Sequence, residues 1–343
     1  MTGRIWVLAN QGEVGGGEVM LHHLATALRE LGRDVAVVAP ARPSETAARL
    51  EADGFAVDRV GGPGRARYMA ALRRWHGAHR NGVVWCNGLL PATALAGRPG
   101  RIVHLHQWIT GPRNSAVARA ALPGALAVLT PSHAVAASIP GSRALTNWVP
   151  APSVARVLRS AETDGPLRVG YLGWFSEDKG FLDFLGAAQT LSAEAPGGWS
   201  FTAAGAPRFT SAEEAARVRA ALAAQTAVQD VGWQRPEGHL PGLDLLVVPS
   251  RVPESFGLVA AEAMAAGVPM AVSDAGALPE VVGPDHPLVF PAGDPLALAA
   301  SVRRARTLDL AGLAAAQHAR WERLYSPQAG RAAVARLLEE LDI

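Results

Sequence analysis

Short apolar runs alternate with stretches of helical pattern along almost the whole chain of 343 residues. The runs are rich in β-branched residues, whereas the stretches between them repeat apolar positions at helical spacing, as in residues 18–31. Short buried strands that alternate with helices form parallel sheets covered by helices on both faces. In the first half of the chain the pattern predicts strands at 4–10, 34–40, 55–60, 83–87, 101–106, 126–132 and 144–150.

The alternation stops at residues 150–166, where Pro, Ser and Gly interrupt the apolar runs, and we interpret 152–166 as a linker. It resumes beyond this segment and ends in an amphipathic helix. In the second half we predict strands at 167–175, 199–205, 228–233, 243–250 and 268–274, with helices after Lys179, over 211–226 and around Glu262.

The fold class that follows is α/β, with two Rossmann-like, doubly wound parallel-sheet domains in tandem. We assign residues 1–151 and the closing helix 327–343 to the first domain, and residues 167–326 to the second. Ligands of such sheets bind at the carboxyl ends of the strands, so the cleft between two such domains is the expected site.

Composition narrows the class of protein without identifying it. An apolar fraction of 49% suffices for two cores, and a single cysteine, Cys86, excludes an internal disulfide. The sequence has no Cys/His cluster with zinc spacing, no signal-peptide pattern at residues 1–18 and no apolar run near the ~18–20 residues of a membrane span. We therefore expect a cytoplasmic protein without a metal centre.

Charge is unevenly distributed, although the formal net charge is only +2. Residues 1–152 contain 16 basic and 8 acidic residues, and residues 59–161 contain 13 Arg and no Asp or Glu. Such a region favours an anionic acceptor or peripheral attachment to an anionic membrane, at its inner face for a cytoplasmic protein. The alternative is a solvated helical surface that uses Arg for solubility. We expect no nucleic-acid partner, and the pattern leaves open a monomer or a dimer.

One basic residue differs from all the others. The chain contains 31 Arg and a single Lys, Lys179, in the segment GYLGWFSEDKGF. This segment follows a predicted strand and opens a helix, so a side-chain cation and free helix-terminal amides converge there. That combination suits a diphosphate group.

A glycine loop, NQGEVGGGE, follows the first predicted strand and opens the first helix. Gly15, Gly16 and Gly17 allow a ligand to approach the backbone, and helix-start amides favour an anion, so we expect an anion or sugar contact. A tight turn alone is the alternative. The dinucleotide motif fails, because Met20 stands where its third glycine belongs and no acidic residue ends the second strand.

Two carboxylates stand eight residues apart in PESFGLVAAEAMAAGVP, with Glu254 before a helical pattern and Glu262 within it. Eight helical residues rise ~12 Å, roughly the distance between the sugar and the ribose of a nucleotide sugar. A carboxylate accepts two hydroxyl hydrogen bonds at once, and the helix-start amides between the two suit phosphate. The alternatives are that Glu254 caps the helix and that Glu262 occupies a solvated position. The second alternative is weak, because a carboxylate in so apolar a helix needs partners.

The segment PSRVPESFGLVAAEAMAAGVPMAVSDAGALPEVVG, residues 249–283, resembles the signature of retaining nucleotide-sugar glycosyltransferases of family 4, which have the GT-B fold. Weaker similarity extends over the glycine loop, NWVP, GYLGWFSEDKG and the closing helix. The resemblance implies that the segment 321–327 returns the chain to the first domain.

The resemblance also implies roles for the matched residues. Glu254 contacts donor-sugar hydroxyls, Glu262 holds the ribose hydroxyls, Lys179 neutralises the diphosphate, and residues 231–234 frame the base. His106 matches the family's active-site histidine, with a strand-end structural histidine as the alternative. We expect catalytic roles for His106, Glu254 and Lys179. The implied donor-binding positions are Gly15, Gly16, Gly17, Trp174, Lys179, Gly232, Trp233, Arg251, Glu254, Ser255, Phe256, Gly257, Leu258 and Glu262.

The sequence departs from the family at one position, because Trp174 stands where many members carry a diphosphate-binding Arg. Either Lys179 acts alone, or Arg251 or Arg208 replaces the missing cation. The sequence contains no Asp-x-Asp motif that would suggest a metal-bridged diphosphate. The resemblance implies metal-independent, front-face transfer with retention, in which the leaving phosphate takes the acceptor proton.

The expected donor is a nucleoside-diphosphate sugar, with UDP or GDP as its nucleotide and no separate cofactor. The expected acceptor is a small molecule, a glycan or a lipid-linked hydroxyl compound, which residues 61–67 and 107–115 of the first domain would recognise. A sugar-nucleotide epimerase and a non-catalytic nucleotide-sugar binder on the same fold are the alternatives.

Overall fold

The computed structural model describes residues 3–79, 82–153 and 165–343, and the described chain forms two compact units. The first, here called the N-terminal domain, comprises the chain up to Trp148 together with Pro327–Ile343. The second, the C-terminal domain, comprises Val149–Ser326. Most of the linker expected at 152–166 lies outside the described residues.

The N-terminal domain is a seven-stranded sheet of order β3-β2-β1-β4-β5-β6-β7, and every described pair is parallel. Its central strands are almost wholly buried, as their continuous apolar sequences predict. The strands are β1 (Ile5–Leu8), β2 (Val35–Pro40), β3 (Ala56–Val60), β4 (Val83–Asn87), β5 (Arg101–His104), β6 (Ala127–Thr130) and β7 (Arg143–Ala144).

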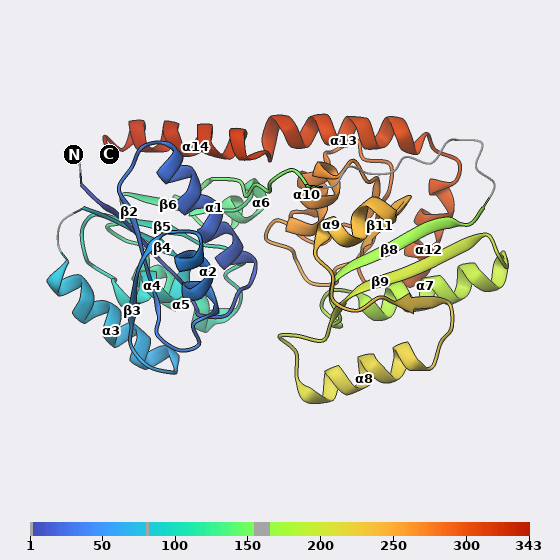
Figure 1. The fold of residues 1–343 in the computed structure, drawn as a ribbon, viewed down its shortest axis with the longest axis horizontal. Helices are drawn as coiled ribbons and strands as arrows, with labels where there is room; N and C mark the ends of the chain where they lie inside the picture. The colour runs from blue at the N-terminus through green and yellow to red at the C-terminus, as the bar shows by residue number, and fades with distance from the viewer. Residues whose placement is uncertain (1–2, 80–81, 154–164) are drawn as a thin grey trace. The chain divides into compact units, whose positions relative to one another are not determined.

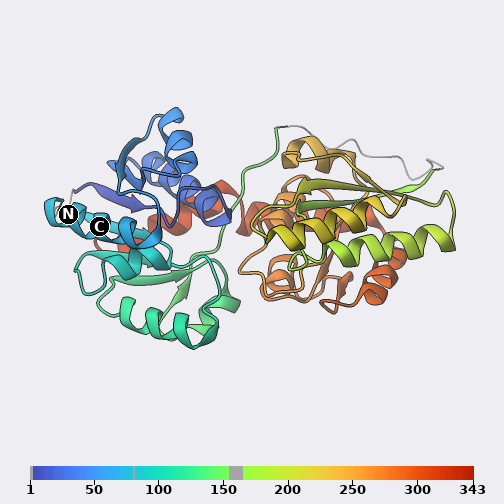
Figure 2. The same cartoon turned by 90° about the horizontal axis from the view of Figure 1, so that it is seen from below.

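Helices cover both faces of this sheet (Figures 1 and 2). Helices α1 and α14 pack against each other, and α4 contacts both α3 and α5. The helix α14 belongs here because Gly330 lies directly on Trp148, where an added Cβ would be 2.2 Å from the ring. The helices are α1 (Gly16–Glu30), α2 (Glu45–Ala52), α3 (Arg65–Ala78), α4 (Leu89–Ala94), α5 (Gly111–Ala121), α6 (His133–Ser138) and α14 (Pro327–Glu340).

The strand predicted at 144–150 is wrong, because only Arg143–Ala144 pairs with β6. Beyond this short strand the chain is held by isolated bonds, from the Asn147 amide to the Pro131 carbonyl and from the Val149 amide to the Tyr325 carbonyl. The ladder ends there because the chain that follows β6 turns into α6, with Ser132 as the N-cap of that helix. The bond to Tyr325 also draws Val149 into the C-terminal domain, three residues earlier than the boundary we assigned at 151.

The C-terminal domain is a six-stranded parallel sheet of order β10-β9-β8-β11-β12-β13. The short edge strand β13 is absent from our sequence-based assignment. The strands are β8 (Leu167–Trp174), β9 (Trp199–Ala206), β10 (Val228–Asp230), β11 (Leu245–Val248), β12 (Met270–Ser273) and β13 (Val289–Phe290). The helices are α7 (Phe181–Glu194), α8 (Ala212–Ala223), α9 (Pro236–His239), η1 (Leu240–Gly242), α10 (Leu258–Ala265), α11 (Leu278–Val282), α12 (Pro295–Ala305) and α13 (Leu310–Leu324).

Aromatic packing fixes the part of this domain that carries Lys179. Phe175 follows β8 and Phe181 begins α7, and their rings stack with centroids 4.1 Å apart. Tyr171 packs against both rings from within β8. Burial of each such side chain contributes roughly 1.5–3 kcal/mol, so both ends of the loop between β8 and α7 are anchored in the core.

Within the described residues, no helix combines the length and the apolar character needed to cross a membrane.

Candidate active site

The loop that carries Lys179 is pressed against the neighbouring strand end. Gly180 has φ +67°, and a Cβ there would lie 1.8 Å from the carbonyl oxygen of Pro249, just beyond β11. Only glycine satisfies both the backbone angle and this contact. The Lys179 amide also donates to the Ser176 hydroxyl at 3.3 Å. The backbone of the single lysine is therefore fixed next to the end of β11.

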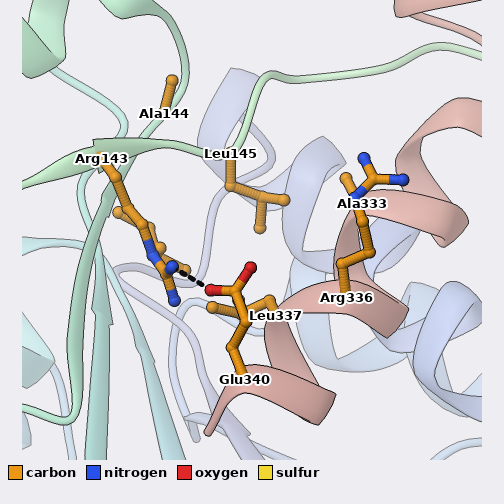
Figure 3. Close-up of a pocket in the computed structure, with 8 residues that line it drawn as sticks. Arg143, Ala144, Leu145, Ala333, Arg336, Leu337 and Glu340 are labelled. Carbon is orange, nitrogen blue, oxygen red and sulfur yellow. Dashed lines mark hydrogen bonds and ion pairs between the residues drawn. The ribbon is translucent and has the colours of Figure 1, made fainter.

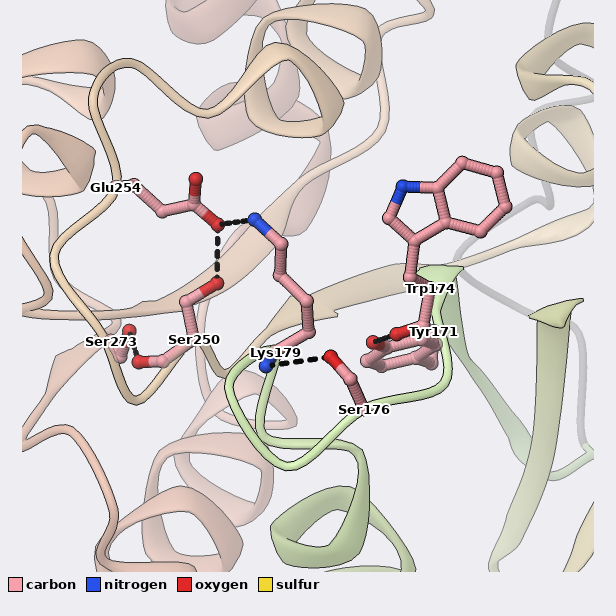
Figure 4. Close-up of polar contacts among 7 residues, drawn as sticks. All are labelled: Tyr171, Trp174, Ser176, Lys179, Ser250, Glu254 and Ser273. Carbon is pink, nitrogen blue, oxygen red and sulfur yellow. Dashed lines mark hydrogen bonds and ion pairs between the residues drawn. The ribbon is translucent and has the colours of Figure 1, made fainter. Parts of the chain in front are cut away.

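Lys179 and Glu254 form an ion pair at the carboxyl ends of β8 and β11. The ammonium Nζ lies 2.5 Å from Glu254 Oε1, and the Ser250 hydroxyl donates to the same oxygen at 2.6 Å. The Ser273 hydroxyl in turn donates to the Ser250 carbonyl at 2.7 Å. Figure 4 shows the two charged side chains approaching from separate loops. The Glu254 side chain is 13% exposed and that of Lys179 35%, so the pair is sheltered but accessible.

The backbone on both sides of Glu254 is equally constrained. Glu254 pairs with Gly276 in an isolated parallel bridge, and the Ala277 amide donates to the Glu254 carbonyl at 2.9 Å. A Cβ on Gly276, which has φ +64°, would lie 2.5 Å from that same carbonyl oxygen. The glycine that follows β12 therefore lets the two loops approach closely enough to hold Glu254 in place.

The helix α10 begins four residues after Glu254, as the sequence pattern predicts. Its N-cap, Gly257, has φ +94°, and a Cβ there would lie 2.6 Å from Leu278 Cδ2. Within the described part of the chain, the amides of Phe256, Gly257 and Leu258 donate to no backbone carbonyl. Free amides at a helix start attract anions, which is the property that the predicted phosphate contact requires.

Glu262 lies in the second turn of α10, between the buried residues Ala261 and Ala263. It is partly exposed, and its carboxylate has no hydrogen bond or ion pair within the described residues. Partial burial between apolar neighbours, reinforced by the nearby carboxylate of Glu237, raises the pKa of Glu262 to about 7. A carboxyl group with a pKa near neutral pH is partly deprotonated there, and its deprotonated form accepts hydrogen bonds from ligand hydroxyls.

The two arginines proposed as substitutes for the missing family cation have different surroundings. Arg251 forms a bidentate ion pair with Asp183 of α7, with distances of 2.7 and 2.6 Å. The guanidinium of Arg208 lies 5.4 Å from the centre of the Trp174 ring, which also contacts Phe209 edge to face. Trp174 thus makes a cation–π contact with Arg208, a residue from the loop after β9.

The residues expected to frame the base follow β10. Gly232 has φ +71°, and its carbonyl accepts from the Gly205 amide at 2.9 Å, which ties the loop to β9. The next residue, Trp233, is 59% exposed. A large aromatic ring left this exposed on a rigid loop is available for stacking.

In the N-terminal domain, the glycine loop opens α1 with Gly15 as its N-cap and no side-chain cap. Glu18, in the first turn, is 5% exposed, and Gln11 Nε2 donates to its Oε2 at 3.3 Å. Its Oε1 is buried without a partner in the described residues. Burial raises the pKa of Glu18 to about 7, so this carboxyl group is partly protonated at neutral pH.

His106 lies two residues beyond the end of β5 and not within the strand predicted at 101–106. Its Nε2 lies 2.7 Å from Asn87 Oδ1, at the end of the adjacent strand β4. The buried ring of His104 lies 4.1 Å from it. Burial lowers the pKa of His106 to about 3, so the ring is neutral at physiological pH.

A separate hollow lies between β7 and α14 and contains none of the predicted residues. It is lined by Arg143, Leu145, Leu337, Glu340 and neighbouring side chains, and the ion pair between Arg143 and Glu340 occupies it (Figure 3).

The sequence analysis did not identify five residues that take part in these contacts: Glu18, Asn87, Asp183, Ser250 and Ser273. Two of them left a signal in the pattern. Asn87 is a polar residue that ends an otherwise apolar strand, and Glu18 occupies an apolar face of its helix. The two serines and Asp183 are ordinary in composition, and only tertiary contacts give them a role.

Two family models match the sequence. The region 14–141 matches the model of Glycosyltransferase Family 4, and the region 166–307 matches that of Glycosyl transferases group 1. No curated protein matches the chain in sequence.

Solved structures share the fold over nearly the whole chain. Sucrose-phosphate synthase from Thermosynechococcus elongatus has a TM-score of 0.81 at 20% identity, covering 98% of this chain and 98% of that chain. HepE from Anabaena, solved in complex with UDP-glucose, has a TM-score of 0.83 at 18% identity, covering 98% and 100%. A glycosyltransferase from Rickettsia africae has a TM-score of 0.78 at 14% identity, covering 98% and 98%.

Two parallel α/β domains, matched over nearly their whole length by such structures, define the GT-B fold. With glycosyltransferase models matching both halves of the sequence, the chain is a glycosyltransferase similar to family 4.

Proposed function

We propose that the protein transfers a sugar from a nucleoside-diphosphate sugar, with UDP as the preferred nucleotide, to an acceptor hydroxyl with retention of configuration and without a metal ion. The observation that supports this most is the Lys179–Glu254 pair beside the free amides of α10. A cation and helix-start amides suit a diphosphate, and the adjacent carboxylate suits a sugar diol. HepE, a structural neighbour, binds UDP and UDP-glucose.

In the proposed complex each residue has a distinct task. Lys179 and the amides of Phe256, Gly257 and Leu258 bind the diphosphate, Glu254 accepts from sugar hydroxyls, and Glu262 accepts from the ribose hydroxyls. The exposed ring of Trp233 stacks on the base. In the N-terminal domain, His106 and the loop Gly15–Gly17 contact the sugar.

The proposed reaction is a front-face displacement. The bond between C1 and the phosphate oxygen breaks, and its electron pair stays with the leaving diphosphate. The acceptor oxygen bonds to C1 on the same face, and its proton passes to the leaving phosphate oxygen. Lys179 and the α10 amides stabilise the charge that develops on the diphosphate.

The deciding experiment combines donor binding with product analysis. A thermal-shift screen against UDP-, GDP-, ADP- and dTDP-sugars should show the largest rise in melting temperature with a UDP-sugar. In wild type UDP-glucose should raise the melting temperature more than UDP does, and in Glu254→Gln this difference should disappear. A stabilising donor is then incubated with candidate hydroxyl acceptors in EDTA, and the anomeric configuration of the product is read by NMR. An inverted product, or dependence on added metal, would contradict the mechanism.

The same assay separates the two alternative functions. An epimerase would convert the donor with no acceptor present, and a non-catalytic binder would be stabilised by the donor without consuming it. Either result would refute transfer.

A further inference from the structure

Asn87, a fully buried residue at the end of β4, joins the two N-terminal parts of the candidate site. Its Nδ2 donates to the Gly17 carbonyl at 2.9 Å, and its Oδ1 lies 2.7 Å from His106 Nε2. Gly17 belongs to the glycine loop and His106 to the loop after β5. The approach is close, because a Cβ on Gly17 would lie 3.5 Å from the His106 side chain. One side chain therefore connects the glycine loop to the histidine.

The Gly17 carbonyl determines which way the Asn87 amide faces. A carbonyl oxygen can only accept, so the group 2.9 Å from it must be the amide NH₂. The amide oxygen is then the atom that faces His106. Because this oxygen also can only accept, the hydrogen between the two side chains belongs to His106 Nε2.

A neutral imidazole carries a single N–H group, and the surroundings of His106 keep it neutral. The Nδ1 atom of His106 is buried, and its ring packs against the buried ring of His104. Burial lowers the pKa of both rings, that of His106 to about 3. With its one hydrogen on Nε2, His106 has its lone pair on Nδ1.

We propose that Asn87 is a positioning residue that fixes the plane of His106 and holds it in the Nε2–H tautomer. A substrate hydroxyl that reaches this ring would then donate to Nδ1, an atom that is buried in the ligand-free structure. This inference rests on the proposed transferase function for its catalytic meaning. The Gly17 carbonyl accepts from Asn87 Nδ2 and so fixes the orientation of the Asn87 amide. That orientation in turn determines the tautomer of His106.

The tautomer can be observed directly in the ligand-free protein. Long-range ¹H–¹⁵N correlation spectra of protein labelled at histidine separate Nε2–H from Nδ1–H rings, and His106→Gln identifies the signal. Wild type should show Nε2–H. Asn87→Leu, which has a similar volume but no acceptor, should shift His106 toward Nδ1–H or a mixture. Asn87→Asp, which keeps an acceptor and adds a charge, should retain Nε2–H and raise the pKa of His106.

A matched control is Asn114→Asp, which places the same new charge on the exposed surface of α5. It should leave the His106 signal unchanged. In the transfer assay, Asn87→Leu should lower kcat by about tenfold or more, whereas donor KM should change less, because the diphosphate and ribose contacts lie in the other domain.

An Nδ1–H ring in wild type would overturn the inference, and so would an unchanged Nε2–H ring in Asn87→Leu. If Asn87→Leu does not fold, the wild-type spectrum and Asn87→Asp still decide the question. The spectra require no substrate, so a protein without transferase activity that shows the expected tautomers would refute the proposed function alone.

Discussion

The ammonium group of Lys179 lies 2.5 Å from the carboxylate of Glu254, and this ion pair connects the loop after β8 to the loop after β11. In the protein without ligand, the carboxylate neutralises the cation that we assign to the diphosphate. Donor binding therefore exchanges one anionic partner of Lys179 for another, while Glu254 gains sugar hydroxyls.

Replacing Lys179 by Ala should weaken binding of UDP and of the UDP-sugar by about 10- to 100-fold, since hydrogen bonds to charged groups contribute about 1.5–3 kcal/mol. Isothermal titration calorimetry measures both affinities. Arg303→Ala removes a cation from another ion pair of the same domain, with Glu194, and should leave both affinities unchanged. Equal losses in the two variants would indicate a general charge effect and would contradict our assignment of Lys179.

Replacing Glu262 by Gln should remove a pH dependence from nucleotide binding. Burial and Glu237 raise the pKa of Glu262 to about 7, and we assign the deprotonated form to the ribose hydroxyls. Wild-type affinity for a UDP-sugar, whose diphosphate is esterified at both ends and does not titrate in this range, should therefore rise between pH 6 and 8, and the affinity of Glu262→Gln should stay flat. Glu237→Gln should move the midpoint to lower pH, because it removes the second cause of the shift. A wild-type affinity that falls over this range would exclude the assigned role of Glu262.

Glu18 should make the stability of the protein depend on pH. Its folded pKa of about 7 lies above its ordinary value of 4.5. The contribution of the protonated carboxyl is therefore fully present below about pH 4.5 and is lost as the pH rises through 7. The stability of Glu18→Gln relative to wild type should increase from pH 5 to pH 8.5, by about 3 kcal/mol at most.

Urea unfolding followed by tryptophan fluorescence measures this difference at each pH. The control is Glu13→Gln, which removes an exposed acid of the same loop and is measured over the same pH range. A difference between Glu18→Gln and wild type that does not change with pH would contradict the raised pKa of Glu18.

Replacing Gly330 by Ala should destabilise the protein, although Gly→Ala normally stabilises a helix by about 0.5–1 kcal/mol. The new Cβ would lie 2.2 Å from the Trp148 ring, and overpacking of this kind costs about 1–3 kcal/mol. Gly186→Ala in α7 meets no atom within 4 Å and should stabilise the protein by the usual amount. Thermal unfolding distinguishes the two, and a stabilised Gly330→Ala would disprove the packing of α14 on Trp148.

The fold could be predicted largely from the sequence because both sheets are parallel and buried. A continuous apolar run such as VVWC identifies its strand, β4, without knowledge of its neighbours. The edges were harder to predict. The strand β7 pairs through only two residues, and its length depends on where its partner β6 turns into α6, which the apolar pattern of 144–150 does not reflect.

Residues of the candidate site could be predicted where a glycine or a charged residue stands out in the sequence. Lys179, the glycines and the spacing of Glu254 and Glu262 all stand out in the sequence, and the structure places Lys179 beside Glu254. The contacts between side chains could not be predicted in this way. Nothing in the sequence pairs Arg251 with Asp183 or Asn87 with His106, since these contacts depend on which strand ends are adjacent in the sheets.

The packing of Gly330 on Trp148 has a consequence for the order in which the chain folds. The strands of the N-terminal domain leave the ribosome before the C-terminal domain does, whereas the helix that covers Trp148 leaves it after that domain. During synthesis the C-terminal domain can therefore be completed while Trp148 is still uncovered. A chain that stops after residue 326 would leave Trp148 uncovered permanently.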